Sequence, residues 1–388
     1  MYGLDLFGRA TYDRRQGRPF LVPRAPCGRL TLTSATPFLT SSVTAATTIY
    51  WTPYQGNFVE LYDTTVNQWV PRTFSELSIA VPATLFRLFD LYAYWTGSAV
   101  ALEAVNWNQT TAALTAATAA APSVVTSAGH GNSNGDLIGL AGLNNTVGTS
   151  ATAGLNGTVW TAANVAANTF EAQGSDTSGL AASTTGTWYK IPNTRATALT
   201  TQDGRYVKTG DASRLYLGMG MTTGTSGQCE CSFGGIDSTP LWLLWNYYHR
   251  ASVQLRYSDS TDSWNYTTAI SRPFNNRGKL ARAGFIAGVN DWQVSADAMN
   301  FVNNSLGALA CGGIDLDGLA ITENFLRALV TTAASYAPIW SRYRGFPSIG
   351  FHYLGHLEFS EAVGTTTHYG DAADETNIQA GLTVTIEA

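Results

Sequence analysis

Short runs of alternating apolar and polar residues recur along almost the whole chain. Alternation with a period of two places successive side chains on opposite faces of an extended strand, so each run predicts a strand with one covered face. Glycine, asparagine, aspartate and proline separate the runs at a spacing typical of sandwiches and barrels. The predicted strands are 29–33, 47–52, 58–62, 88–94, 101–107, 205–208, 215–221, 253–257, 263–269, 284–289, 349–359 and 382–387.

The predicted strand near residue 350 can be assigned face by face. One face carries Phe351, Tyr353, Leu357 and Phe359, and the other carries His352, His356, Glu358 and Ser360. Because a strand of an antiparallel sheet is commonly covered on one side only, we expect the first face in the core. The second face is expected to contact solvent or a partner.

Few segments have the period of a helix. The best candidate is 322–334, where Phe325, Leu326, Leu329 and Val330 form an apolar stripe and Thr322 can cap the first turn. Threonine, valine and aromatic residues favour strands, and 45% hydrophobic content is ample for packed cores. The sequence therefore predicts an all-β protein, with a β-sandwich or jelly-roll-like host region and at most one or two short helices.

One long stretch has no positive charge. From Leu88 to Tyr189 there is no lysine or arginine, and threonine, alanine and glycine dominate its second half. Such a surface cannot follow phosphates, which argues against nucleic acid as a partner. Two similar segments, 107–114 and 193–199, border this half.

These borders predict a small β module inserted in a surface loop, where insertions are best tolerated. The insert is 110–192, and the host region is 30–109 with 193–388, which can divide further near residue 250. Within the insert we expect four short strands, at 123–127, 136–140, 157–162 and 169–172.

The first 29 residues form a basic arm on an acidic body. The whole chain has a net charge of −5, but the arm alone carries six arginines and two aspartates. Interleaved proline and glycine exclude a regular helix. The arm is interpreted as a docking segment for a partner, and the open alternative is a strap over its own domain. The partner-docking candidates are Arg9, Arg14, Arg15, Arg18, Arg24 and Arg29.

The four cysteines are too few and too scattered for a disulfide framework. Cys229 and Cys231 lie two apart and would share a face of a strand. They suggest either a disulfide to a neighbouring subunit or free thiols that stay reduced during cytosolic folding. No second pair at zinc-site spacing accompanies them.

No metal or cofactor site is expected. His352 and His356 would lie about 13 Å apart on a strand and cannot share one ion. The segment 315–318 resembles a fragment of a calcium loop, but a turn fits it better. The aromatic cluster 242–249 is interpreted as core, with sugar stacking as the alternative. We expect no secretory signal, since residues 1–15 lack an apolar core segment, and no membrane insertion, since no run approaches ~20 apolar residues.

Several host segments together resemble a widespread, poorly characterised family of structural proteins from tailed bacteriophages and prophages. The likeness covers most of residues 28–388, while the insert resembles a small β module that recurs in phage virion proteins. The host segments are 46–57, 73–77, 194–204, 245–250, 261–267, 350–353 and 364–371, and those of the insert are 126–136 and 156–162. The insert itself is absent from many relatives.

The resemblance implies a virion component, such as a spike, fibre or decoration subunit on the head, neck or tail, made in the host bacterial cytoplasm. Its expected partners are capsid, portal or tail proteins, further copies of itself in a homo-oligomer, and a host surface glycan. No catalytic residues follow from it, so we expect no enzyme and no cofactor. The alternative is a host-glycan-binding tail adhesin or polysaccharide depolymerase, which would need an aromatic groove with a carboxylate pair.

Overall fold

Strands make up nearly all regular structure in the described part of this protein. The computed structural model describes residues 11–13, 18–20, 25–151, 153–289, 293–320, 326–329, 337–373 and 379–388, with backbone alone for 11–13, 18–20, 319–320 and 326–329. The all-β prediction is confirmed. Within these ranges the helical elements are α1 (Asn145–Thr149) and the 3-10 turn η1 (Phe274–Asn276). No helix of the described residues is long and apolar enough to cross a membrane.

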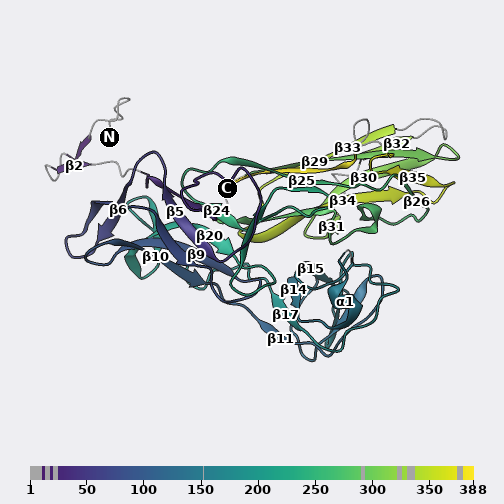
Figure 1. Ribbon diagram of the computed structural model, residues 1–388, viewed down its shortest axis with the longest axis horizontal. Coiled ribbons are helices and arrows are strands. Elements are labelled where there is room, and N and C mark those ends of the chain that lie inside the picture. Colours follow the sequence, from purple (N-terminus) through teal and green to yellow (C-terminus); the bar gives the residue numbers. More distant parts are fainter. Residues whose placement is uncertain are drawn as a thin grey trace.

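Three sheets form an N-terminal body at one end of the elongated molecule (Figure 1). The largest runs in the order β10 (Val100–Asn106), β9 (Leu88–Trp95), β20 (Asp211–Met221), β19 (Arg205–Lys208) and β18 (Leu199–Gln202), with β24 (Leu244–Asn246) paired to β20. Smaller sheets are β3 (Gly28–Thr31), β5 (Thr48–Pro53) with β8 (Leu77–Ala80), and β6 (Phe58–Asp63) with β7 (Gln68–Thr73). A separate hairpin pairs β1 (Thr11–Asp13) with β2 (Arg18–Phe20).

Two facing sheets form a sandwich at the other end. The first runs β31 (Leu319–Ala320), β30 (Leu309–Leu316), β34 (Gly350–Ser360), β28 (Arg282–Ala287), β23 (Leu241–Trp242), β21 (Cys229–Ser232) and β4 (Val43–Ala46), with β27 (Arg272–Pro273) and β32 (Leu326–Leu329) at its side. The second runs β22 (Gly234–Ile236), β25 (Ser252–Ser258), β36 (Gly381–Glu387), β29 (Val294–Asn304), β35 (Thr366–Tyr369) and β26 (Trp264–Tyr266), with β33 (Ala337–Gly345) on β29.

The alternation that predicted the strands is visible in β25, where Val253, Leu255 and Tyr257 are buried and the residues between them are exposed. One continuous hydrophobic cluster runs through both the N-terminal body and the sandwich. It includes Trp242 and Trp245, which confirms the core interpretation of the aromatic cluster. Because β4 and β21 pair across the chain, the two bodies are tied together by strands as well as by packing.

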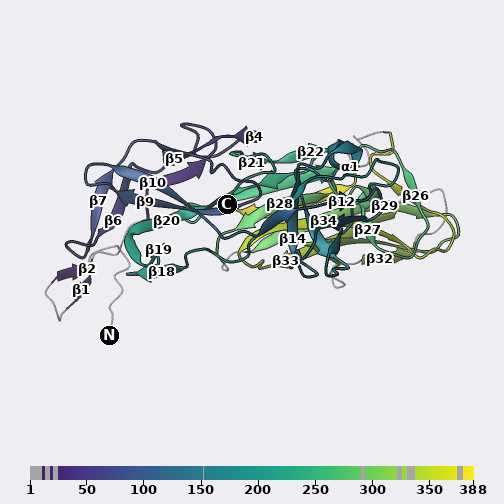
Figure 2. The ribbon, with the colours of Figure 1, turned by 90° about the horizontal axis from the view of Figure 1, so that it is seen from below.

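The insert has a sheet and a hydrophobic core of its own. Its order is β11 (Thr111–Ala113), β17 (Thr187–Lys190), β14 (Leu137–Ala141), β15 (Thr158–Ala163), β16 (Thr169–Ala172), β13 (Ser123–Thr126) and β12 (Ala116–Ala117). The four predicted strands correspond to β13, β14, β15 and β16. Since the first and last strands pair with one another, the chain enters and leaves the insert at one point. The insert lies along one face of the sandwich (Figures 1 and 2).

The helix predicted at 322–334 is wrong where the structure describes it. Leu326–Leu329 is strand β32, and it pairs with β30 through Leu309, Ala310, Cys311 and Gly312. The rest of that segment, apart from these four residues, lies outside the described residues. An open strand edge supplied the backbone partners here, and this outweighed a weak helical stripe.

A buried ion pair joins the two chain connections between the insert and its host, which are together called the neck of the insert. Asp90 on β9 lies 3.1 Å from Nε of Arg195, which follows the insert in the chain. Nε1 of Trp107, which precedes the insert, donates to Asp90 at 3.0 Å, and the Arg195 guanidinium lies 5.0 Å from the Trp107 ring. Burial raises the pKa of Asp90 to about 6, although Arg195 opposes this shift. The pair therefore joins both host edges of the insert inside the core.

Replacing Arg195 by leucine should destabilise the protein by about 3–5 kcal/mol, because it leaves the carboxylate of Asp90 buried without its cation. Adding Asp90→Asn to this variant should recover part of the loss. Urea unfolding of both variants measures the effect. As a control, Arg342→Leu removes an exposed ion pair with Asp297 and should cost at most about 1 kcal/mol. Equal losses in the two single variants would contradict the role of the neck pair.

Candidate functional site

The insert docks firmly on the sandwich through polar contacts. Thr161 on β15 donates its hydroxyl to the carbonyl of Asp317 at 2.6 Å and lies 2.9 Å from the hydroxyl of Tyr353. Gln173 donates to the carbonyl of Gly318 at 2.7 Å. These bonds fix strands β15 and β16 of the insert against β30 and β34, and the space between them is named the inter-module cleft.

Glycines allow the two modules to approach closely. A Cβ at Gly139 of β14 would lie 2.4 Å from the ring of Phe86, and one at Gly224 would lie 2.5 Å from the backbone of Gly157. A Cβ at Gly278 would meet the carbonyl of Gly174 at 2.0 Å. Side chains at these positions would separate the surfaces, so the insert is held in one orientation.

Two cavities occupy the inter-module cleft, with volumes of about 440 Å³ and 200 Å³. Arg282 and Tyr353 line both, so they form the wall between the cavities. Arg282 begins β28, and its guanidinium lies 4.8 Å from the ring of Trp160 in the insert and 4.6 Å from that of Tyr353. This cation is therefore held between one aromatic ring from each module.

The larger cavity contains one unusual carboxyl group. Asp315 on β30 is buried, and its Oδ1 has no hydrogen-bond partner. Burial raises the pKa of Asp315 to about 7. Asp317 adds to the rise, while the backbone N–H of Gly355 and the charge of Arg282 oppose it. Asp315 is thus poised between its neutral and charged forms near neutral pH.

The segment 315–318 is a hairpin turn, as the sequence analysis favoured. Asp317 and Gly318 join β30 to β31 with φ angles of 55° and 76°, which suits a two-residue loop. The carboxylate of Asp317 accepts from the backbone of Tyr353 at 2.9 Å and lies 2.7 Å from Nδ1 of His352. Asp317 is therefore used for structure.

The exposed face predicted for β34 is wrong. His356, Glu358 and Ser360 have no exposed surface, and His352 is 7% exposed. Nε2 of His356 lies 2.8 Å from Oδ1 of Asn300 on the facing sheet. The second sheet of the sandwich covers this face and the insert covers the other, so β34 is buried on both sides.

Three ring nitrogens of the histidines at this sheet interface lack a hydrogen-bond partner. Nδ1 of His356 and both ring nitrogens of His368 are buried without a hydrogen bond. The ring of Phe274 stacks on His356 at 4.0 Å. Burial lowers the pKa of His356 to about 3, and the neighbouring His368 adds to this effect. In the part of the chain that the structure describes, no three or more His, Cys, Asp or Glu side chains are arranged to hold a metal ion.

Both cysteines proposed for an intersubunit disulfide are inaccessible. Cys229 and Cys231 on β21 have no exposed surface and are free thiols. Burial raises the pKa of Cys229 to about 12 and that of Cys231 well above its ordinary value. A neighbouring subunit cannot reach either sulfur while β21 stays between β4 and β23, so the burial contradicts the disulfide interpretation.

One of the proposed docking arginines is part of the core. Arg29 on β3 is 4% exposed, and its guanidinium donates to the carbonyl oxygens of His249 and Ala388. Burial lowers its pKa to about 10. Arg29 is therefore not available for a partner. Arg9, Arg14, Arg15 and Arg24 lie outside the described residues, and only the backbone of Arg18 is described.

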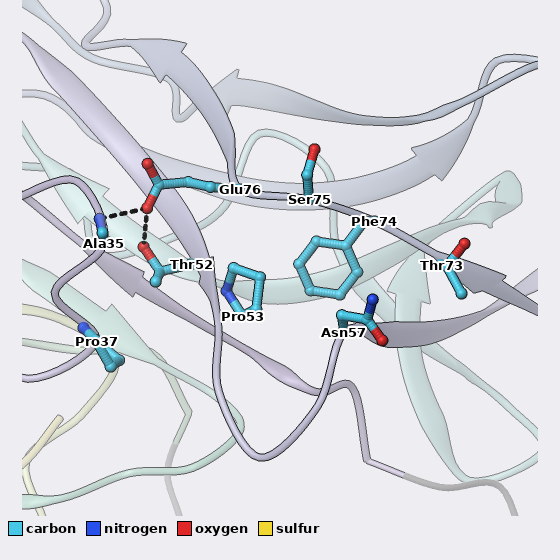
Figure 3. Close-up of a pocket in the computed structure, with 9 residues that line it drawn as sticks. All are labelled: Ala35, Pro37, Thr52, Pro53, Asn57, Thr73, Phe74, Ser75 and Glu76. Carbon is cyan, nitrogen blue, oxygen red and sulfur yellow. Dashed lines mark hydrogen bonds between the residues drawn. The ribbon is translucent and has the colours of Figure 1, made fainter.

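A wide hollow on the N-terminal body, about 700 Å³ in volume, is shown in Figure 3. Glu76 points across it toward Ala35 and Thr52 and accepts a hydrogen bond of 2.6 Å from each. Ser34 donates a further bond. Burial acts to raise the pKa of Glu76, but these three bonds outweigh it and hold the pKa below its usual value. Because these internal bonds use its carboxylate oxygens, Glu76 holds the loop of Ser34 and Ala35 in place. The inter-module cleft is therefore the better candidate site.

Sequence reasoning missed Arg282, Lys279, Tyr353 and the role of Asp315. The sequence did contain a signal for the two cations. Lys279 is one of only three lysines, and it lies three residues before Arg282, which begins a buried strand. The partners from the insert, Thr161 and Gln173, carry no comparable signal. Thr161 and Gln173 contact the sandwich only because of the way in which the insert docks on it.

No protein-family model and no curated protein matches this chain. Similar solved structures include dimeric latent PorU from Porphyromonas gingivalis (7% identity, 72% of this chain and 24% of that chain, TM-score 0.24). They also include the insecticidal delta-endotoxin Cry8Ea1 from Bacillus thuringiensis (7%, 94% and 52%, 0.21) and the VP2 subviral particle of infectious bursal disease virus (10%, 80% and 73%, 0.21). The chain thus spans less than two thirds of the first two. At these TM-scores the likeness supports no statement about function.

The buried histidines predict destabilisation by acid. Since the folded pKa of His356 lies below the ordinary value near 6.5, the folded state disfavours protonation. The stability from neutral His356 is complete above pH ~6.5 and falls by about 1.4 kcal/mol per unit as the pH decreases toward the folded pKa. His356→Gln should therefore reduce the slope of the unfolding free energy between pH ~6.5 and ~4.5, measured by urea denaturation.

His352 supplies the control with opposite sign. Its hydrogen bond with Asp317 raises its pKa despite the opposing effect of burial, so its contribution is present below pH ~6.5 and is lost at higher pH. His352→Gln should leave the slope on the acid side unchanged. An unchanged slope in His356→Gln would show that the buried pair does not set the acid response.

Proposed function

We propose that this protein is a structural component of a tailed-bacteriophage virion, a spike, fibre or decoration subunit that acts by assembly and surface binding. The observation that supports this most is the insert, which resembles a virion β module and has its own core. It is joined to its host at one point and docked rigidly. A rigid attached module presents a surface in a fixed orientation, as an assembly component must.

The chemistry of the cleft favours binding over hydrolysis. A depolymerase of the usual kind needs two carboxyl groups across one substrate site. Among the residues that line the two cavities, Asp315 is the carboxyl of the larger and Glu230 that of the smaller. Each cavity thus offers one carboxyl, beside amide and hydroxyl side chains in the larger and hydroxyl side chains in the smaller. One carboxyl beside other polar groups is compatible with glycan binding. Hydrolysis by a depolymerase of the usual kind would lack its second carboxyl.

The virion proposal is tested on intact particles. An antibody against an epitope tag should label purified particles at one position, seen by electron microscopy. Purified protein mixed with host polysaccharide should release no new reducing ends. Absence of label on every particle, with the tag detectable in the lysate, would refute the virion assignment. Release of reducing ends would restore the depolymerase alternative.

The docking role of the arm is tested separately by charge. Replacing Arg9, Arg14, Arg15, Arg18 and Arg24 by glutamine should leave the melting temperature unchanged and remove the protein from particles, as judged by immunoblots of purified virions. Replacement of the same five by lysine keeps the charge and should preserve incorporation to a large extent. Normal incorporation of the glutamine variant would contradict the docking role. Arg29 is left intact because it is buried in the core.

A further inference from the structure

Two basic side chains line the smaller cavity of the inter-module cleft. Arg282 is 7% exposed and Lys279 is partly buried, and both belong to the lining of this cavity. Burial lowers the pKa of Lys279, and the charge of Arg282 adds to this lowering, so the two cations are close enough to repel. Like charges in a partly buried site destabilise it unless a counter-charge is present.

The described residues provide no ion-pair partner for either cation. The nearby ion pairs join Arg272 to Glu358 and Arg277 to Asp237, and no carboxylate oxygen of a described residue lies within 4.0 Å of Arg282 or Lys279. Glu230 lines the same cavity, and burial raises its pKa. The smaller cavity therefore combines two basic side chains with one carboxyl, Glu230, that forms no ion pair with either of them. Asp315, whose charge acts on Arg282, lines the larger cavity.

The remaining lining of this cavity is suited to a sugar ring. The hydroxyl groups of Thr158, Thr223 and Thr239 donate to backbone carbonyl groups and offer a ligand their acceptor lone pairs. Phe86 and Phe351 provide apolar surface. The volume of 200 Å³ corresponds to roughly seven water molecules at ~30 Å³ each. A single small ion would leave most of this space unfilled, whereas a monosaccharide with one acidic group fills it.

We propose that the smaller cavity binds an acidic sugar, with the carboxylate of the ligand between Arg282 and Lys279 and its hydroxyl groups among the threonines. The ring lies over the apolar side chains of Phe86 and Phe351, which contact its C–H groups. Arg282 provides a planar set of donors that matches a carboxylate, and Lys279 provides a second charge. This site deepens the proposed surface-binding role by naming the class of ligand.

The test is titration calorimetry of the full-length protein with three probes: glucuronate, glucose and inorganic phosphate. Glucuronate should bind with a Kd on the order of 1 mM, as expected for one monosaccharide. Glucose has the same ring without the carboxylate and should bind at least tenfold more weakly. Phosphate supplies the charge without the ring and should also bind at least tenfold more weakly.

Variants separate the two cations from general effects. Lys279→Gln, which is only partly buried, should keep the melting temperature and weaken glucuronate about tenfold or more. Arg282→Gln should abolish detectable binding, and Lys279→Gln decides the matter if Arg282→Gln fails to fold. Arg344→Gln removes an exposed arginine of β33 and is the matched control, with unchanged affinity expected.

Each other outcome overturns the proposal. Equal affinity for glucose shows that the carboxylate is not recognised, and equal affinity for phosphate shows a bare oxyanion site such as a phosphorylated surface polymer would use. No binding of glucuronate, or wild-type affinity in Lys279→Gln, excludes the site. Particle labelling is independent of these results, so a virion component without this sugar site remains distinguishable from a failure of both proposals.

Discussion

The buried pair of Asp90 and Arg195 is the constraint on which the arrangement of the modules depends. An insert of about eighty residues can swing on its connections unless its two ends are fixed in the host. Here the residues on either side of the neck, Trp107 and Arg195, meet on one carboxylate inside the core. A buried charge is costly to strand, so the neck tolerates little displacement. The ion pair thereby fixes where the chain leaves and re-enters the host, and this position limits where the insert can dock.

Docking then determines the environment of the central strand of the sandwich. Strand β34 is covered by the second sheet on one side, through His356 and Asn300, and by the insert on the other, through Tyr353 and Thr161. A strand buried on both faces normally has an almost continuous apolar sequence. This strand instead keeps two histidines and a glutamate. Glu358 and His352 are hydrogen-bonded, whereas Nδ1 of His356 is buried without a partner. The predicted acid sensitivity and the inter-module cleft are two consequences of the same burial.

The sequence predicted the elements well and their surroundings less well. Alternation located β25, β34 and the four strands β13 to β16 of the insert, because side-chain period is a local property. It could not say which face of β34 is covered, since that depends on strands far away in the chain. Arg29 shows the same limit, because only the folded structure reveals the carbonyl groups of His249 and Ala388 that bind it. Strand β32 was missed because its backbone partners lie on β30.

The candidate site is a property of the assembled modules. Arg282 comes from the sandwich, but one of the two rings that enclose it, Trp160, comes from the insert. A ligand held at Arg282 therefore binds only the docked arrangement, and it stabilises docking by RT ln(1 + [L]/Kd). At a concentration of a hundred times Kd this amounts to about 2.7 kcal/mol. Surface binding and the rigidity of the module are thus thermodynamically linked, because the same cation needs both modules to be in place.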